Sequence, residues 1–302
     1  MLGLFLLIGV GFIAVRGKIV HASASSPMSA LLMNITLPTT VFVSMLRPFD
    51  IGFLRDAGII LVLTVALICL YVFVGGLAAP LFQVPEGRRG MWILCCAFCN
   101  NGFMGLPVVF SIFGDEGVAL AVMLNISSTI LVNILGVRLV MLDNQEKSGS
   151  SAISWRKILV NPVCCAVFIG FIFYVLQIPV PKAIYTPIQH LSNATTPLSM
   201  VVTGMSLAES RIREVVSDRD AVTGSFMRLV VLPILTWGIL VVLPISNQLV
   251  VGVMLVIMAM PCAAIAVVLG EEYHGCTQLG ARAVFLSSLT CMATIPLITL
   301  LL

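Results

Sequence analysis

The chain has 302 residues, of which 60% are hydrophobic and 10% charged, and its mean hydropathy is +1.13. Soluble domains contain about 45–50% apolar and about 25% charged residues, so this composition excludes a soluble protein and predicts a chain that crosses a membrane several times. The net charge of +3 comes from basic residues scattered between apolar blocks, a pattern that excludes a nucleic-acid-binding protein.

Ten apolar segments, separated by charged, proline and glycine residues, are candidates for membrane helices, which need about 20 residues each. In chain order they lie at residues 1–15, 27–46, 57–80, 90–112, 117–141, 157–177, 187–208, 221–243, 249–270 and 279–301. No positively charged residue precedes the first segment, and Arg16 and Lys18 follow it. We therefore expect a retained first span and not a cleaved signal peptide.

The longest polar stretch, at residues 143–157, separates the fifth candidate span from the sixth. We expect a first five-helix repeat at 1–142, a cytoplasmic linker at 143–157 and a second five-helix repeat at 158–302. Because each half contains an odd number of spans, any repeat between the halves must be inverted across the membrane.

The orientation follows from the placement of lysine and arginine, which favour the cytoplasmic side. If the N-terminus lies outside, only Arg47, Arg55 and Lys182 of the 16 basic residues fall on the outer side. We therefore expect a multi-pass protein of the plasma membrane with both termini on the non-cytoplasmic side.

Two patterns recur in both halves and support an inverted repeat. The second span contains N-x-T-x-P at Asn34–Pro38, and the seventh span contains it at Asn193–Pro197, an offset of 159 residues. The fourth span is interrupted at Pro107 and the ninth at Pro261, an offset of 154 residues. Both offsets are close to half of the chain. The alternative is that these prolines merely kink their helices, since proline is frequent in membrane helices.

The interruption at Pro107 predicts a polar site inside the protein. Proline lacks an N–H donor and collides with the carbonyl four residues earlier, and Gly105 loosens the same turn. Unpaired backbone groups cost several kcal/mol each in hydrocarbon, so the break must face protein or water. The half-helix that begins near Pro107 offers free N–H groups and a positive dipole end to a carboxylate.

Asn100 and Asn101 lie one turn before the predicted break, and their carboxamides can donate hydrogen bonds to an anion or a hydroxyl. We expect Asn100, Asn101 and Gly105 to contact a substrate, with Pro107 and Pro261 as the two helix breaks.

Charged groups near mid-membrane restrict the mechanism. Every aspartate and glutamate falls in a loop or near a helix end, so no intramembrane carboxylate is available for cation exchange. Arg228 and Arg282 lie several residues inside their helices. We expect both side chains to extend to the cytoplasmic interface; the alternative is that they attract an anionic substrate.

No motif predicts an enzyme, a cofactor or a metal site. The chain lacks H-E-x-x-H, G-x-S-x-G and the P-loop pattern, which also excludes ATP-driven transport by this chain alone. Cys96 and Cys99 form a CxxC pair without further ligands at metal-binding spacing. The nine cysteines fall in or beside apolar segments, so disulfides are not expected.

The segment Cys99–Pro107 (CNNGFMGLP), and Met260–Pro261 followed by Glu271–Tyr273 (EEY), resemble the auxin efflux carrier family of bacterial permeases and plant auxin carriers. The likeness covers nearly the whole chain. It implies an all-α membrane protein with ten transmembrane helices in two inverted five-helix repeats, similar to bile-acid and sodium/proton transporters, in which the broken helices 4 and 9 cross.

The resemblance also implies how such a protein works. Helices 1, 2, 6 and 7 would form a scaffold, which places Asn34, Pro38, Asn193 and Pro197 on the scaffold side. Helices 3, 4, 5, 8, 9 and 10 would move against it in an elevator-like cycle, with Asn100 as a substrate contact and a possible homodimer through the scaffold. The run after Pro261 is apolar, unlike that of plant members, so their contacts on that side are not transferred.

We therefore expect a secondary active or facilitative transporter of small organic anions, either a dicarboxylate such as malate or malonate or an auxin-like monocarboxylate. The alternative is an anion channel or pore-forming protein, because broken helices that line water also suit a channel.

Overall fold

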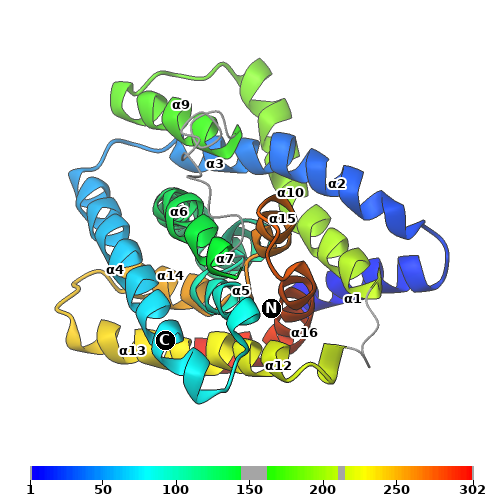
Figure 1. Ribbon diagram of the computed structural model, residues 1–302. Coiled ribbons are helices and arrows are strands. Elements are labelled where there is room, and N and C mark those ends of the chain that lie inside the picture. The colour runs from blue at the N-terminus through cyan, green and yellow to red at the C-terminus, as the bar shows by residue number, and fades with distance from the viewer. Residues whose placement is uncertain (1, 144–161, 210–214, 301–302) are drawn as a thin grey trace. The chain divides into compact units, whose positions relative to one another are not determined.

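The computed structural model describes residues 2–143, 162–209 and 215–300, and this part of the chain is built of helices (Figure 1). Within these ranges the one extended pairing is an isolated antiparallel bridge between Cys99 and Cys262. The predicted all-α class is therefore confirmed. Of the expected linker at 143–157, all residues after Asp143 lie outside the described ranges.

Several of these helices have the length and composition of membrane spans. Within the described ranges, five stretches qualify on their own: Ser25–Met45, Ile51–Leu81, Asn101–Leu142, Arg219–Val242 and Thr277–Thr299. Three shorter helices are also apolar: Gly3–Arg16, Pro162–Leu176 and Gln248–Met258. The chain is accordingly a multi-pass membrane protein.

The stretch Asn101–Leu142 is too long for a single span. Its 42 residues correspond to roughly 63 Å of helix, about twice the thickness of the hydrocarbon core. Gly114 has φ 63° and ψ −157°, so α6 (Leu106–Leu131) consists of two helices that meet at this residue. Glycine adopts a positive φ without steric cost, which explains why the chain turns here.

Contacts divide the chain into two units. The first unit comprises residues 1–59, 102–126 and 154–209, and the second comprises residues 60–101, 127–153 and 210–302. Each unit thus combines segments from both halves of the sequence.

The first unit is built on close helix pairs. Its elements are α1 (Leu2–Arg16), α2 (Ser25–Leu31), the π-helical turn η2 (Leu32–Thr36), α3 (Leu37–Met45), α9 (Pro162–Leu176), α10 (Lys182–Glu209), the start of α4 (Ile51–Leu81) and most of α6. Helix α1 packs along α10, and α3 packs on α9 and α10. A Cβ atom added to Gly11 would lie 2.0 Å from the carbonyl oxygen of Val201, so the two backbones are in direct contact there. Small residues permit this approach between membrane helices.

The second unit contains the interrupted helices. Its elements are the rest of α4, α5 (Glu86–Ala97), the turn η4 (Val132–Gly136), α7 (Val137–Leu142), α12 (Arg219–Phe226), the turn η6 (Met227–Val231), α13 (Leu232–Val242), α14 (Gln248–Met258), α15 (Ile265–Glu272) and α16 (Thr277–Thr299). Helix α5 packs on α7, α12 and α16. A Cβ atom on Gly90 would lie 1.8 Å from the carbonyl oxygen of Leu139, so glycine also permits the crossing of α5 and α7.

Three π-helical turns share a cause that can be read in the sequence. The turns η2, η3 (Asn101–Gly105) and η6 are each followed, two residues later, by a proline: Pro38, Pro107 and Pro233. A proline ring collides with the carbonyl four residues earlier in a regular α-helix. The wider π-helical turn relieves this collision while the chain stays helical.

Candidate functional site

The two interrupted helices of the second unit meet through their backbones. Residues 98–100, between α5 and η3, and residues 259–264, between α14 and α15, are not helical. The N–H of Asn100 donates to the carbonyl of Pro261 at 2.8 Å, and the N–H of Ala263 donates to the carbonyl of Phe98 at 3.0 Å. These two bonds flank the antiparallel bridge between Cys99 and Cys262.

This pairing explains how two breaks persist in a buried position. Phe98, Met260 and Cys262 are at most 1% exposed, so their backbone groups need partners inside the protein. The bridge satisfies part of this requirement, and Ser287 of α16 accepts a hydrogen bond from the N–H of Cys262 at 3.0 Å. Each broken helix thus supplies partners that the other lacks.

The interruption of the fourth span lies earlier than Pro107. Pro107 is the second residue of α6 and follows η3, where proline is tolerated because the π-helical turn accommodates its ring. Pro261 lies within its own break and contributes its carbonyl to the bridge. Both prolines are buried; Pro107 belongs to the first unit and Pro261 to the second.

Asn101 is the polar residue of this site with an unused donor. Its side chain is 8% exposed, and its backbone N–H donates to the carbonyl of Cys99 at 3.0 Å. Its Nδ2 is buried and has no hydrogen-bond partner among the described residues. A buried amide nitrogen without a partner costs about 1–3 kcal/mol, so such a group calls for an explanation. Asn100 is half-buried beside it, and Gly105 is buried at the end of η3.

The repeated N-x-T-x-P pattern holds two helices of the first unit together through its threonines. Thr36 and Thr195 are each 2% exposed, and the Thr195 hydroxyl donates to the carbonyl of Thr36 at 2.8 Å. The hydroxyl of Thr40 donates to Thr195 Oγ1 at 2.7 Å. This cluster joins the η2–α3 segment to α10.

The asparagines and prolines of the same pattern lie elsewhere. Asn34 is exposed, and its Nδ2 donates to the carbonyl of Ala30 in its own helix at 2.8 Å. Asn193 and Pro197 are exposed as well, and Pro38 is half-buried. Asn34 and Thr36 are two positions apart, which corresponds to a rotation of about 200° around a helix axis. Burial of the threonine therefore turns the asparagine outward.

Arg228 is the most informative residue that the sequence analysis misplaced. Its side chain is completely buried in η6 instead of extending to the interface. Nε donates to the carbonyl of Met260 at 2.9 Å and Nη2 to that of Met258 at 2.8 Å. Nη1 donates to the carbonyls of Cys96 and Ala97 at 3.1 and 3.4 Å.

These four carbonyls lie at the C-terminal ends of α5 and α14, where helical hydrogen bonding stops. The guanidinium therefore fills the open acceptors of both interrupted helices at once. Tyr71 supports it: the guanidinium carbon of Arg228 lies 5.5 Å from the centre of the Tyr71 ring, and the hydroxyl of Tyr71 donates to the carbonyl of Leu232 at 3.0 Å. The sequence did contain a signal for this role of Arg228, because two interrupted spans imply unpaired carbonyls that require a hydrogen-bond donor.

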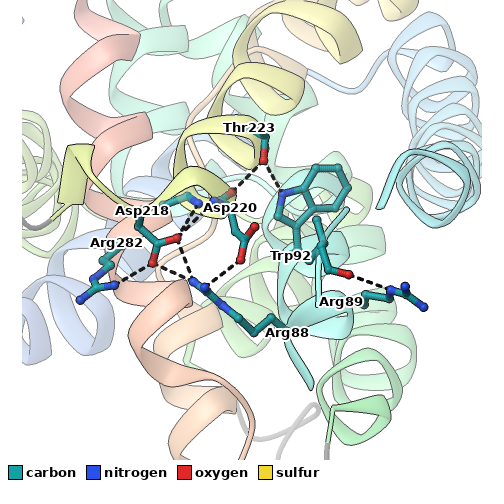
Figure 2. Close-up of polar contacts among 9 residues, drawn as sticks. Arg88, Arg89, Trp92, Asp218, Asp220, Thr223 and Arg282 are labelled. Atoms are coloured by element: carbon teal, nitrogen blue, oxygen red, sulfur yellow. Dashed lines mark hydrogen bonds and ion pairs between the residues drawn. The ribbon is translucent and has the colours of Figure 1, made fainter. Parts of the chain in front are cut away.

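A charged cluster fixes the starts of α5 and α12 to α16 (Figure 2). Arg88 donates to both carboxylate oxygens of Asp218 at 2.9 and 2.7 Å and pairs with Asp220 at 2.7 Å. Arg282 pairs with Asp218 at 2.7 Å, so a carboxylate at the start of α12 holds its side chain. Asp218 also caps α12 by accepting from the N–H groups of Asp220 and Ala221.

Two carboxylates in this region have shifted pKa values of opposite sign. Burial alone would raise the pKa of Asp218, but hydrogen bonds from Arg282 and Arg88 hold it below its usual value. Asp143 accepts from the N–H groups of Gly90 and Met91 at 2.7 and 2.8 Å. There burial outweighs these hydrogen bonds and raises the pKa of Asp143.

Comparisons with known proteins agree with a transport role. The family described as membrane transport protein matches residues 1–299. An uncharacterized transporter of Methanothermobacter thermautotrophicus is 28% identical over 98% of this chain and 95% of its own length. The uncharacterized transporter MJ1031 of Methanocaldococcus jannaschii is 25% identical over 97% and 94%, and the uncharacterized transporter YfdV of Escherichia coli K12 is 21% identical over 98% and 95%.

Proposed function

We propose that this chain, which belongs to the membrane transport protein family of auxin efflux carriers, is a secondary active or facilitative carrier of small organic anions. Transport itself follows from the family and from the transporter relatives. The proposal adds the substrate class: a dicarboxylate such as malate or malonate, or an auxin-like monocarboxylate.

The observation that carries the proposal is the unused amide of Asn101 beside two paired helix breaks. The amide hydrogens on Nδ2 donate only, so the missing partner is an acceptor, and a carboxylate is the strongest acceptor among small metabolites. The carboxamide also lies within a few residues of carbonyls that bind the positive charge of Arg228. The unused donor favours a negatively charged solute, and the nearby carbonyls that could hold a cation are already bound by Arg228.

The mechanism that we propose is alternating access of the elevator type in a fold of ten transmembrane helices and two inverted repeats. Helices α1, α2–α3, α9 and α10 would form the scaffold; they lie in one unit, together with the start of α4 and most of α6. The meeting of two interrupted helices within the other unit supports its role in substrate transport. A homodimer through the scaffold in the plasma membrane completes the proposal.

The first experiment replaces Asn101 in purified protein reconstituted into vesicles. Asn101→Ala removes the donor, and we expect the counterflow of labelled malate, malonate or indole-3-acetate to fall by roughly tenfold to one hundredfold, because a hydrogen bond to a charged group is worth about 1.5–3 kcal/mol. The protein should fold normally, since Nδ2 has no hydrogen-bond partner to lose.

Asn133→Ala is the matched control. Asn133 lies in the π-helical turn η4, and its Nδ2 donates to the carbonyl of Thr129 in its own helix at 2.8 Å. Counterflow by this variant should equal that of the wild type. Unchanged counterflow by Asn101→Ala would remove Asn101 from the site, and flux without saturation or counterflow would favour the channel.

A further inference from the structure

Arg228 carries an inference about cation coupling, which goes beyond the proposed substrate class and rests on the proposed transport function. In carriers with broken helices, the coupling sodium ion is coordinated by backbone carbonyls of unwound segments and by the C-terminal ends of half-helices. The described structure contains this type of position, at the ends of α5 and α14. A side chain of the protein already fills it.

The geometry matches a cation in both charge and contacts. Each helix C-terminus carries roughly half a negative charge, so two converging ends amount to roughly one. The guanidinium supplies one positive charge, is completely buried, and donates to four carbonyls at 2.8–3.4 Å. Among the described residues no carboxylate forms an ion pair with it, so its partners are the four carbonyls, the Tyr71 ring and the thiol of Cys99.

Arg228 is not placed to bind the transported anion itself. An arginine has five N–H donors, and four hydrogen bonds to backbone carbonyls leave little donor capacity for a substrate carboxylate. The four carbonyls that it binds all belong to residues beside the two breaks. The role that fits these contacts is to neutralise and fix the two helix ends.

We propose that the guanidinium of Arg228 is a built-in cation in the carbonyl-lined position where a cation-coupled carrier would bind sodium, so that this protein transports its substrate without sodium. Removal of this side chain should leave a site of four carbonyls near Met258 and Cys96. That site has the ligand chemistry of a small monovalent cation, and guanidinium itself should also fit it.

The test measures the thermal stability of purified protein in detergent, which needs no substrate. Wild-type Tm should be the same in sodium, potassium and N-methylglucamine chloride at equal ionic strength. Arg228→Met should unfold at a lower temperature, and millimolar sodium or guanidinium should raise its Tm by about 2–4 °C relative to N-methylglucamine. Arg282→Met is the control: it removes an arginine that is 24% exposed and whose partner is a carboxylate, so neither cation should restore its stability selectively.

Folded Arg228→Met without any cation-specific gain in Tm would overturn the proposal, as would a sodium requirement for wild-type malate counterflow.

If the methionine variant does not fold, a second variant, Arg228→Lys, tests the proposal. Its ammonium keeps the charge with three donors, so counterflow should persist at a reduced rate and stay unchanged when sodium is replaced. Sodium-dependent counterflow by Arg228→Lys, or none from folded protein, contradicts the proposal. If the wild type does not transport malate, only the proposed substrate is contradicted, because the Tm experiment needs no substrate.

Discussion

Asp218 shows how one residue can join several elements. Its side chain is 4% exposed, and its carboxylate binds Arg88 and Arg282 and caps α12 by accepting from the N–H groups of Asp220 and Ala221. The two arginines belong to α5 and α16, so one side chain connects three helices (Figure 2). Removing one member of such a buried group leaves the other charges without partners, which is more costly than the loss of a surface ion pair.

Replacement of Asp218 by asparagine should therefore destabilise the protein by about 2–4 kcal/mol, measured as a lower Tm. Asparagine is also a good N-cap, so the loss reports on the ion pairs and not on the cap. Glu86→Gln is the control: Glu86 is 82% exposed and lies 3.4 Å from Arg89, so its loss should cost less than about 0.5 kcal/mol.

The wild type and Asp218→Asn should also differ in how their Tm depends on pH. The pKa of Asp218 is lower in the folded protein than in the unfolded chain, so its stabilising effect is complete above the ordinary aspartate pKa and is lost as the pH falls through the lowered value. The Tm difference between wild type and Asp218→Asn should therefore be constant above about pH 5 and should shrink between about pH 4 and about pH 2. Asp143, whose pKa is raised, acts with the opposite sign but equally in both proteins. A difference that stays constant over this range would contradict the ion-pair explanation.

At the scale of elements, helix packing depends on glycine at defined crossings. Gly204 of α10 faces α1, where an added Cβ would lie 1.9 Å from the carbonyl oxygen of Ile8. Gly11 occupies the corresponding place on α1. Neither contact can be relieved by rotating a flexible side chain, because the neighbouring atoms belong to the backbone. The two helices must separate to admit even one methyl group.

Gly204→Ala should therefore destabilise the first unit by about 1–3 kcal/mol or more, seen as a lower Tm. Gly9→Ala is the matched control, because a Cβ at Gly9 would have no atom within 4 Å. Alanine favours helix over glycine, so Gly9→Ala should be neutral or slightly stabilising. Equal Tm values for the two variants would show that α1 and α10 do not approach as closely as described.

At the scale of the whole molecule, the orientation in the membrane remains a prediction of the sequence. Lys18 and Lys182 are both exposed, at the end of α1 and the start of α10. The excess of basic residues on one side assigns Lys18 to the cytoplasm and Lys182 to the outside.

Cysteine labelling can test this assignment in intact cells. In a background without the nine native cysteines, Lys182→Cys should react with a membrane-impermeant maleimide, and Lys18→Cys should react only after the membrane is permeabilised. Each variant serves as the control of the other. The reverse pattern would invert the orientation, and labelling of both from outside would contradict an odd number of crossings between them.

The sequence by itself determined that this is a helical membrane protein and that two of its spans are interrupted. Apolar length, proline and glycine act locally, through the cost of unpaired backbone groups and the geometry of one turn. The interruption around Pro261 and the end of a helix near Gly114 were predictable to within a few residues, whereas the break of the fourth span, expected at Pro107, lies at residues 98–100.

Only the tertiary structure decided which side chains satisfy the interrupted helices. Arg228 and Cys96 are 132 residues apart in the sequence, and Thr195 and Thr36 are 159 apart, yet each pair forms a hydrogen bond. A local pattern shows that acceptors will be open but not which distant donor reaches them, because that depends on how the helices pack. For the same reason the burial of Arg228 and of the unpaired Asn101 amide could be known only after the chain had folded around them.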